Sequence, residues 1–139
     1  MVSRVLVAMD GSEMAERALE HAIEAYEGAD VTVLTVVGEP SVMWSKATAL
    51  ALANDIEEAA DERAAPVLER ARAIAEEHGV EIEAEVGLGA PAREILDRAP
   101  AFDVVVLGSH GGGLTDRLIV GNVASKVFRH SPVPVTVVR

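Results

Sequence analysis

A glycine-rich stretch between two apolar segments is the part of this sequence best suited to bind a ligand. Residues 104–107 are all Val or Leu, and they are followed by Gly108, by three glycines at 111–113 and by Gly121. Glycine tolerates positive φ angles and lets a ligand come close to the backbone. Free amides beside the positive end of a helix attract an anion such as phosphate. The stretch is therefore a candidate phosphate site, and a plain mobile loop is the alternative.

The spacing of these glycines separates the stretch from other phosphate-binding motifs. Two residues lie between Gly108 and Gly111, and nine lie between Gly111 and Gly121. No Gly-Lys-Ser or Gly-Lys-Thr follows, and the Rossmann spacing is absent. The chain also lacks a Gly-x-Ser-x-Gly elbow, a His-Glu-x-x-His zinc pair and any cysteine, and its four histidines are scattered. We expect no catalytic set and no protein metal site.

With these glycines in place, the sequence resembles the universal stress protein family in its ATP-binding branch. The family is marked by Gly-x-x-Gly, nine residues, and Gly followed by Ser or Thr, which GSHG and Gly121 match except that Asn122 replaces the hydroxyl residue. The resemblance extends over nearly the whole chain. It includes VLVAMDGSEMAERAL, VTVLTVV, GLGAPAREIL, DVVVLGSHG and SPVPVTVV.

The resemblance implies ATP as the ligand, which Mg²⁺ or Mn²⁺ can accompany through its phosphate oxygens. It places three groups of residues around the nucleotide. Ala8, Met9, Asp10 and Val36 would line the adenine and ribose; Leu107, Gly108, His110 and Gly111 would hold the ribose and first phosphates; Gly121, Asn122, Val123 and Ala124 would meet the outer phosphates.

Three of the side chains near this site have a second interpretation from local signals alone. Asp10 follows a strand and is either a turn residue that accepts from the backbone or a ligand contact. His110 is either a functional loop residue or a histidine satisfied by solvent. Arg117 is either a counter-charge for phosphate or a solvated partner of Asp116.

The elements that must position these residues alternate between strands and helices. Apolar periodicity predicts strands at 4–9, 31–37, 80–86, 104–107 and 133–138. Between them it predicts helices that bury apolar residues three and four positions apart. Ser12 is expected to cap the first helix, and Pro66 to kink the second or split it near Ala65. The last helix, from about Gly121 to His130, is expected to bury Val123, Val127 and Phe128.

This alternation predicts an α/β fold, a five-stranded parallel sheet of order 3-2-1-4-5 with helices on both faces. Such a sheet is Rossmann-like and is similar to the adenine nucleotide α-hydrolase-like arrangement. Ligands bind beyond the carboxyl ends of the strands, where the strand order reverses. Asp10 and Gly108 are then expected to face one crevice, and the strands at 80–86 and 133–138 to lie at the edges.

Composition restricts the class of protein. A length of 139 residues fits one domain, 1–139, and a net charge of −11 argues against a nucleic-acid or anionic-membrane partner. The charge is uneven, because residues 1–103 carry 8 Lys or Arg against 22 Asp or Glu, and residues 104–139 carry 4 against 1.

The start does not read as a signal peptide and no apolar run reaches transmembrane length, so a cytoplasmic location is expected.

The sequence is compatible with three functions. The first is a cytoplasmic ATP-binding universal stress protein that is not an enzyme, a homodimer through the strand at Val133 to Val138 that acts as a nucleotide-dependent switch or stress-survival factor. The second is the same fold without nucleotide, working through protein contacts. The third is an adenine-nucleotide hydrolase, which would need a Ser-Gly-Gly-x-Asp-Ser loop where this chain has DGSEMA.

Overall fold

The computed structural model describes residues 1–38, 53–110 and 121–139, with the backbone alone for residues 53–56. Strands and helices alternate through these ranges as the sequence predicts. The elements are β1 (Arg4–Ala8), α1 (Glu13–Ala25), β2 (Asp30–Val37), α3 (Ala53–Glu77), β3 (Ile82–Leu88), α4 (Pro91–Arg98), the 3-10 turn η1 (Ala99–Ala101), β4 (Val104–Gly108), α5 (Asn122–His130) and β5 (Val135–Val138).

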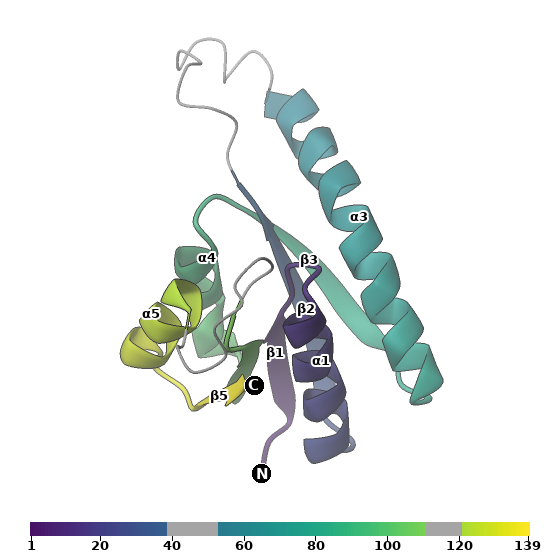
Figure 1. The fold of residues 1–139 in the computed structure, drawn as a ribbon, viewed down its shortest axis with the longest axis vertical. Helices are drawn as coiled ribbons and strands as arrows, with labels where there is room; N and C mark the ends of the chain where they lie inside the picture. Colours follow the sequence, from purple (N-terminus) through teal and green to yellow (C-terminus); the bar gives the residue numbers. More distant parts are fainter. Residues whose placement is uncertain (39–52, 111–120) are drawn as a thin grey trace.

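The strands form one parallel sheet in the order β3-β2-β1-β4-β5, which confirms the predicted topology. Figure 1 shows α1 and α3 on one side of the sheet and α4 and α5 on the other. Each side has its own hydrophobic cluster, one under α1 and α3 and one under α4 and α5. None of the helices in the described ranges is both long and apolar enough to cross a lipid bilayer.

The central strand β1 shows why these residues form a sheet covered on both faces. Val5, Leu6 and Val7 are fully buried. Val5 and Val7 belong to the cluster beneath α1 and α3, and Leu6 belongs to the other cluster. Because successive side chains of a strand point to opposite faces, a run of apolar residues suits only a strand with helices on both sides.

Helix α1 begins as predicted, with Ser12 as its N-cap. The Ser12 Oγ accepts a hydrogen bond from the Ala15 amide at 3.1 Å, which satisfies one of the free donors of the first turn. The apolar stripe is buried up to Ile23, whereas Tyr26 is the half-buried C-cap residue. This cap starts α1 at Glu13, three residues after Asp10.

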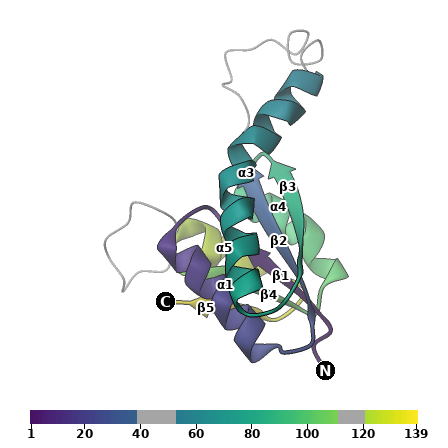
Figure 2. The same ribbon diagram turned by 90° about the vertical axis from the view of Figure 1, so that its right-hand side faces the viewer.

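Helix α3 is continuous through Pro66, so the predicted split into two pieces is not found. Figure 2 shows its first part inclined to the remainder. Pro66 is exposed, and a proline at a solvent-facing position leaves the unpaired carbonyl of the preceding turn accessible to water. The buried residues on either side, Ala64 and Leu68, keep the helix on the sheet.

Strand β3 begins two residues later than predicted and ends two residues later, so Gly87 and Leu88 are strand rather than loop. The cause is the end of α3, where Gly79 has a φ of +71° and the Val80 amide donates to the Ala75 carbonyl at 3.0 Å. Val80 thereby closes the helix and does not enter the strand. The predicted edge positions of β3 and β5 are both confirmed.

The prediction of which α5 residues are buried was partly wrong. Val127 is buried as expected, but Ala124 is the second buried residue. Val123 is 36% exposed and Phe128 is 55% exposed. The reason is that Ala124 and Val127 are three residues apart and face the sheet together, so Val123 and Phe128 project to either side of them.

Candidate functional site

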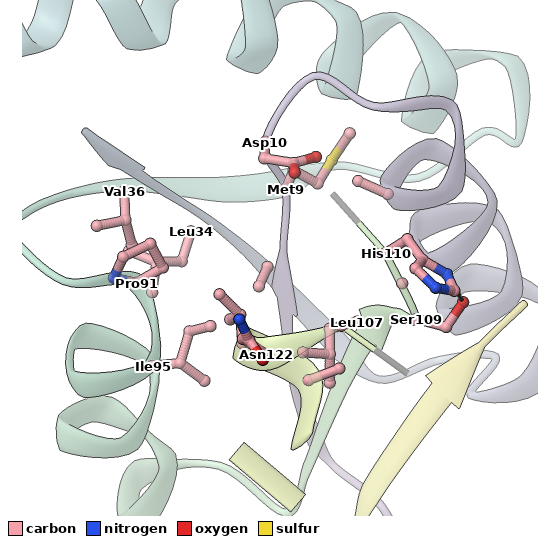
Figure 3. Close-up of a pocket in the computed structure, with 16 residues that line it drawn as sticks. Met9, Asp10, Leu34, Val36, Pro91, Ile95, Leu107, Ser109, His110 and Asn122 are labelled. Atoms are coloured by element: carbon pink, nitrogen blue, oxygen red, sulfur yellow. Dashed lines mark hydrogen bonds between the residues drawn. The ribbon is translucent and has the colours of Figure 1, made fainter. Parts of the chain in front are cut away.

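A cavity of about 300 Å³ opens at the carboxyl ends of β1 and β4, the neighbouring strands at which the strand order reverses. Figure 3 shows Leu34, Val36 and Pro91 on one side of it, Ser109 and His110 on the opposite side, and Asp10 between them. The lining residues come from six elements and their loops. They are Ala8, Met9, Asp10, Ala15, Leu34, Val36, Pro91, Ile95, Leu107, Gly108, Ser109, His110, Gly121, Asn122, Val123 and Ala124.

Every predicted site residue that the structure describes lines this cavity. Gly111 lies outside the described residues, as do Gly112, Gly113 and Arg117. The fold therefore brings Asp10 and Gly108 to one crevice although 98 positions separate them in the sequence numbering. Their contact with a ligand stays a prediction.

Sequence reasoning missed five residues of the lining. Leu34 could have been found, because it lies two residues before Val36 on the same strand and shares its face. Pro91 and Ile95 lie on α4, and the sequence gives no signal for how far that helix reaches toward β2. The full set of missed residues is Ala15, Leu34, Pro91, Ile95 and Ser109.

The backbone of Val36 offers a hydrogen-bond donor and an acceptor at one wall of the cavity. The ladder between β1 and β2 ends at the pair Ala8 and Leu34, and the Leu34 carbonyl accepts its last bond from the Met9 amide at 2.9 Å. Val36 is oriented like Leu34, so its N–H and C=O point to the same side, beyond the end of β1. No described residue bonds to them there. These two groups are available to a ligand.

Asp10 is a turn residue, as one of its two interpretations predicts, and it also forms part of the cavity wall. Its Oδ1 accepts a hydrogen bond from the Ser12 amide at 3.0 Å, which holds the turn before α1. The residue is exposed and lies at the rim of the cavity. Within the described part of the chain, the second carboxylate oxygen has no hydrogen-bond partner and can accept from a ligand hydroxyl.

Gly108 and Gly121 serve close packing, and neither has a positive φ. Gly121 has a φ of −65°, and Gly108 is not among the glycines of positive φ. A Cβ on Gly108 would lie 2.9 Å from the Met14 Cγ, and one on Gly121 would lie 2.9 Å from the Ser109 carbonyl oxygen. The Gly121 amide also donates to that oxygen at 2.6 Å. The Gly121 amide was expected to face phosphate, but it donates its hydrogen bond within the protein.

The start of α5 retains three amides for an anion. Asn122, Val123 and Ala124 form its first turn, and no side-chain hydrogen bond caps this end of the helix. The Ser125 amide is the first that bonds within the helix, to the Gly121 carbonyl at 2.9 Å. The partial positive charge of a helix start is directed along these amides. Asn122 is exposed, and Figure 3 shows its side chain between Ile95 and Leu107.

Ser109 and His110 form a buried polar pair at the end of β4. Ser109 is 1% exposed and His110 is 8% exposed, so the interpretation of His110 as a solvated loop residue is wrong. The Ser109 Oγ lies 3.0 Å from the His110 Nδ1. The His110 Nε2 is buried and has no partner among the described residues. The Ser109 amide donates to the Val138 carbonyl at 2.7 Å, which ties this corner to β5.

The comparisons with known proteins agree over the full length of the chain. The chain matches the universal stress protein family over residues 1–139. The chain belongs to the universal stress protein family. It is 32% identical over 148 residues to the universal stress protein YxiE of Bacillus subtilis, with all of both chains covered.

Solved structures show the same fold as this universal stress protein. The universal stress protein UspA from Lactobacillus plantarum is 28% identical, with a TM-score of 0.81 over 99% of this chain and 98% of that one. A universal stress protein solved in complex with cAMP is 26% identical, with a TM-score of 0.72 over 99% of this chain and 97% of that one. The second structure contains an adenine nucleotide.

The cavity of this universal stress protein is apolar at its base and carries little charge. Asp10 is the one acidic side chain in the lining, and neither Lys nor Arg is among the described lining residues. Through the described ranges no group of three or more His, Asp or Glu could hold a metal ion. The apolar lining, the free Asp10 oxygen and the first-turn amides of α5 suit a ligand with an apolar ring, hydroxyl groups and an anionic end.

Proposed function

We propose that this universal stress protein binds an adenine nucleotide in the cavity between β1 and β4. The observation that carries the proposal is the uncommitted N–H and C=O of Val36 on an apolar wall. Adenine presents a ring-nitrogen acceptor next to its N6 amino donor, which complements such a pair. Leu34, Pro91 and Ile95 cover the same side of the cavity and provide apolar contact for the ring.

The remainder of the cavity supplies complementary groups for the sugar and the phosphate. The free oxygen of the Asp10 carboxylate accepts hydrogen bonds from ribose hydroxyls. The three amides of the first α5 turn face an anion, and the helix dipole favours negative charge there. The relative solved in complex with cAMP supports an adenine nucleotide in a site of this fold.

The biological role follows from the resemblance to the ATP-binding branch of the family. We take ATP as the nucleotide of that branch, with Mg²⁺ or Mn²⁺ held through its phosphate oxygens. The protein then acts in the cytoplasm as a nucleotide-dependent switch or stress-survival factor, and as a homodimer through β5. In this proposal the protein holds the nucleotide as a binding protein and not as an enzyme.

The test is nucleotide binding by the purified full chain. Isothermal titration calorimetry with AMP, ATP and GMP should show saturable binding of the adenine nucleotides and weaker binding of GMP. A mass spectrum of material released on denaturation should contain an adenine nucleotide. No saturation by any adenine nucleotide up to millimolar concentration would overturn the proposal and favour a protein that works through protein contacts alone.

A matched pair of variants localises the site. Asp10→Ala removes the carboxylate at the cavity rim and should weaken adenine nucleotides at least tenfold, which is about 1.4 kcal/mol. Asp97→Ala removes an exposed carboxylate of α4 outside the cavity lining and should leave the affinity unchanged. Equal effects of the two variants would place the nucleotide elsewhere.

A further inference from the structure

We infer that Arg98 is a positioning residue for the base of the nucleotide, because it holds α4 on β3 where Pro91 and Ile95 can wall the cavity. Its partners are Glu85 of β3 and Glu94 of α4. The inference rests on the proposed function. It adds residues outside the cavity lining that determine how firmly the adenine ring is held.

Two residues of β3 lie beside the two β2 residues that line the cavity. Glu85 pairs in register with Leu34, and Gly87 pairs in register with Val36. Leu34 and Val36 belong to the cluster beneath α4 and α5. Paired residues of neighbouring strands face the same side of a sheet, so positions 85 and 87 also face α4. Contacts of α4 with these two positions therefore set its distance from the wall that Leu34 and Val36 form.

Helix α4 contacts both positions, and Arg98 joins the two contacts. The Arg98 Nε donates to the Glu85 Oε1 at 3.0 Å. The Glu94 side chain lies over Gly87, where an added Cβ would be 3.0 Å from the Glu94 Oε1 and 3.3 Å from its Cγ. The Arg98 Nη1 donates to that Oε1 at 3.2 Å and to the Glu94 carbonyl at 3.1 Å. One guanidinium thus holds a carboxylate of β3 and a carboxylate of α4.

Few other contacts hold α4 in place. Ile95 is the one buried residue among its eight. Its N-cap residue, Ala90, makes no side-chain hydrogen bond to the first turn. The side chains of Arg98 and Glu94 are only 25% and 20% exposed, so solvent screens this ion pair less than a fully exposed one. The charged cluster therefore carries a large part of the orientation of α4.

The position of Arg98 along α4 connects this cluster to the cavity. Pro91, Ile95 and Arg98 are spaced by four and three residues, so they lie along one side of the helix. Pro91 and Ile95 line the cavity (Figure 3). A helix of this length spans about 12 Å, so a change of tilt at Arg98 moves its whole cavity side. Asp10 and the α5 amides belong to other elements and keep their places, so the base loses contact and the ribose and phosphate do not.

The experiment is a titration of the full chain with AMP and with ribose 5-phosphate, which has no base. Arg98→Met removes the guanidinium and should weaken AMP about tenfold, the order expected for lost charge-assisted hydrogen bonds. The affinity for ribose 5-phosphate should not change. Glu85→Gln should act in the same direction with a smaller effect. Arg93→Met is the control, because it removes an exposed arginine of the same helix and should leave both affinities unchanged.

The methyl resonance of Ile95 reports the position of α4 directly. Saturating AMP should shift the Ile95 Cδ1 methyl signal through the ring current of the adenine. The shift should be smaller in Arg98→Met and intermediate in Arg98→Lys, because lysine keeps the charge but lacks the fork that holds two carboxylates. A loss of stability alone would not change this shift in the folded, saturated protein.

The outcomes separate this inference from the proposed function. If Arg98→Met and Glu85→Gln leave the AMP affinity and the Ile95 shift unchanged, the inference fails and the proposed function stands. Equal losses of AMP and ribose 5-phosphate affinity, or an equal loss in Arg93→Met, would also overturn it. If Arg98→Met does not fold, Arg98→Lys and Glu85→Gln decide the question. Failure of every adenine nucleotide to bind the wild-type protein overturns both proposals.

Discussion

At the scale of single residues, close packing explains why two positions of the family motif, 108 and 121, are glycine. Gly108 is glycine because α1 crosses the end of β4, with Met14 where a side chain would begin. Gly121 is glycine because the Ser109 carbonyl occupies the corresponding space. Both contacts bring backbones together at the cavity, so the motif fixes the shape of the site before any ligand is present.

The close approach at Gly108 gives the first prediction. Gly108→Ala places a Cβ 2.9 Å from the Met14 Cγ and 3.0 Å from its backbone carbon, so α1 must move. We expect a loss of about 1–3 kcal/mol in the free energy of unfolding, as for other overpacked positions. Chemical denaturation measures it. Gly38→Ala is the control, because a Cβ there meets no atom of the described residues within 4 Å. Equal stability of the two variants would contradict the packing role.

The start of α5 gives a second prediction at this scale. Asn122→Asp places a carboxylate at the first helical position, where it stabilises the helix by about 0.3–1 kcal/mol and repels phosphate. Nucleotide affinity should fall at least tenfold while the melting temperature stays equal or rises. Gly121 is less suitable for this substitution because of its contact with Ser109. Calorimetry measures the affinity, and unchanged binding in Asn122→Asp would show that the anion lies elsewhere.

At the scale of elements, periodicity predicts strands and helices well and side-chain exposure at their ends less well. The run at 104–107 became the buried strand β4, and the charged alternation at 80–86 correctly indicated an edge strand. The shift of β3 arises because Val80, apolar and next to the strand, is used to close α3. Phe128 was expected in the core with Val123 and Val127, but a helix of nine residues buries only a narrow stripe.

The candidate site could be predicted where residues follow strands and not where a helix approaches from outside. Asp10, Val36 and Gly108 lie at strand ends, whose common edge follows from the topology. Pro91 and Ile95 depend on how α4 packs, which no local pattern contains. The commitment of the Gly121 amide to Ser109 is likewise a tertiary contact and cannot be deduced from glycine spacing.

The junction between β1 and β4 gives a prediction about pH. The Asp103 Oδ2 accepts from the amides of Ser3 and Arg4 at 2.8 and 2.9 Å, and these bonds hold the pKa of Asp103 below its ordinary value of 3.8. A carboxyl whose pKa is lowered by folding stabilises the protein above its unfolded-state pKa. That contribution is lost as the pH falls through the lower, folded-state pKa.

Asp103→Asn should therefore lower the melting temperature at pH 7, and the difference from the wild-type protein should shrink as the pH falls below about 4. Asp97→Asn, on exposed α4 surface, should show no such dependence on pH. Thermal melts from pH 3 to 7 test this. A difference between Asp103→Asn and the wild-type protein that is constant over this range would show that the bonds to Ser3 and Arg4 do not favour the charged form.

At the scale of the whole molecule, β5 is an open edge of the sheet, and α5, the helix that precedes it, carries the exposed Phe128. Every residue of β5 is partly exposed. Phe128 lies near the end of α5, seven residues before β5 begins, and it is not part of the buried stripe of that helix.

The proposed homodimer through β5 can be tested with this residue. We expect a second copy that pairs with β5 to cover Phe128 as well, because this large apolar side chain is 55% exposed in the single chain and lies on the helix before β5. Phe128→Asp should raise the dimer dissociation constant at least tenfold, about 1.4 kcal/mol, in sedimentation velocity runs over a concentration series. Val80→Asp is the control, because Val80 is an exposed apolar residue beside β3, at the opposite edge of the sheet. A dimer that Phe128→Asp leaves intact would place the interface away from α5, and a wild-type monomer at all concentrations would remove the homodimer from the proposed function.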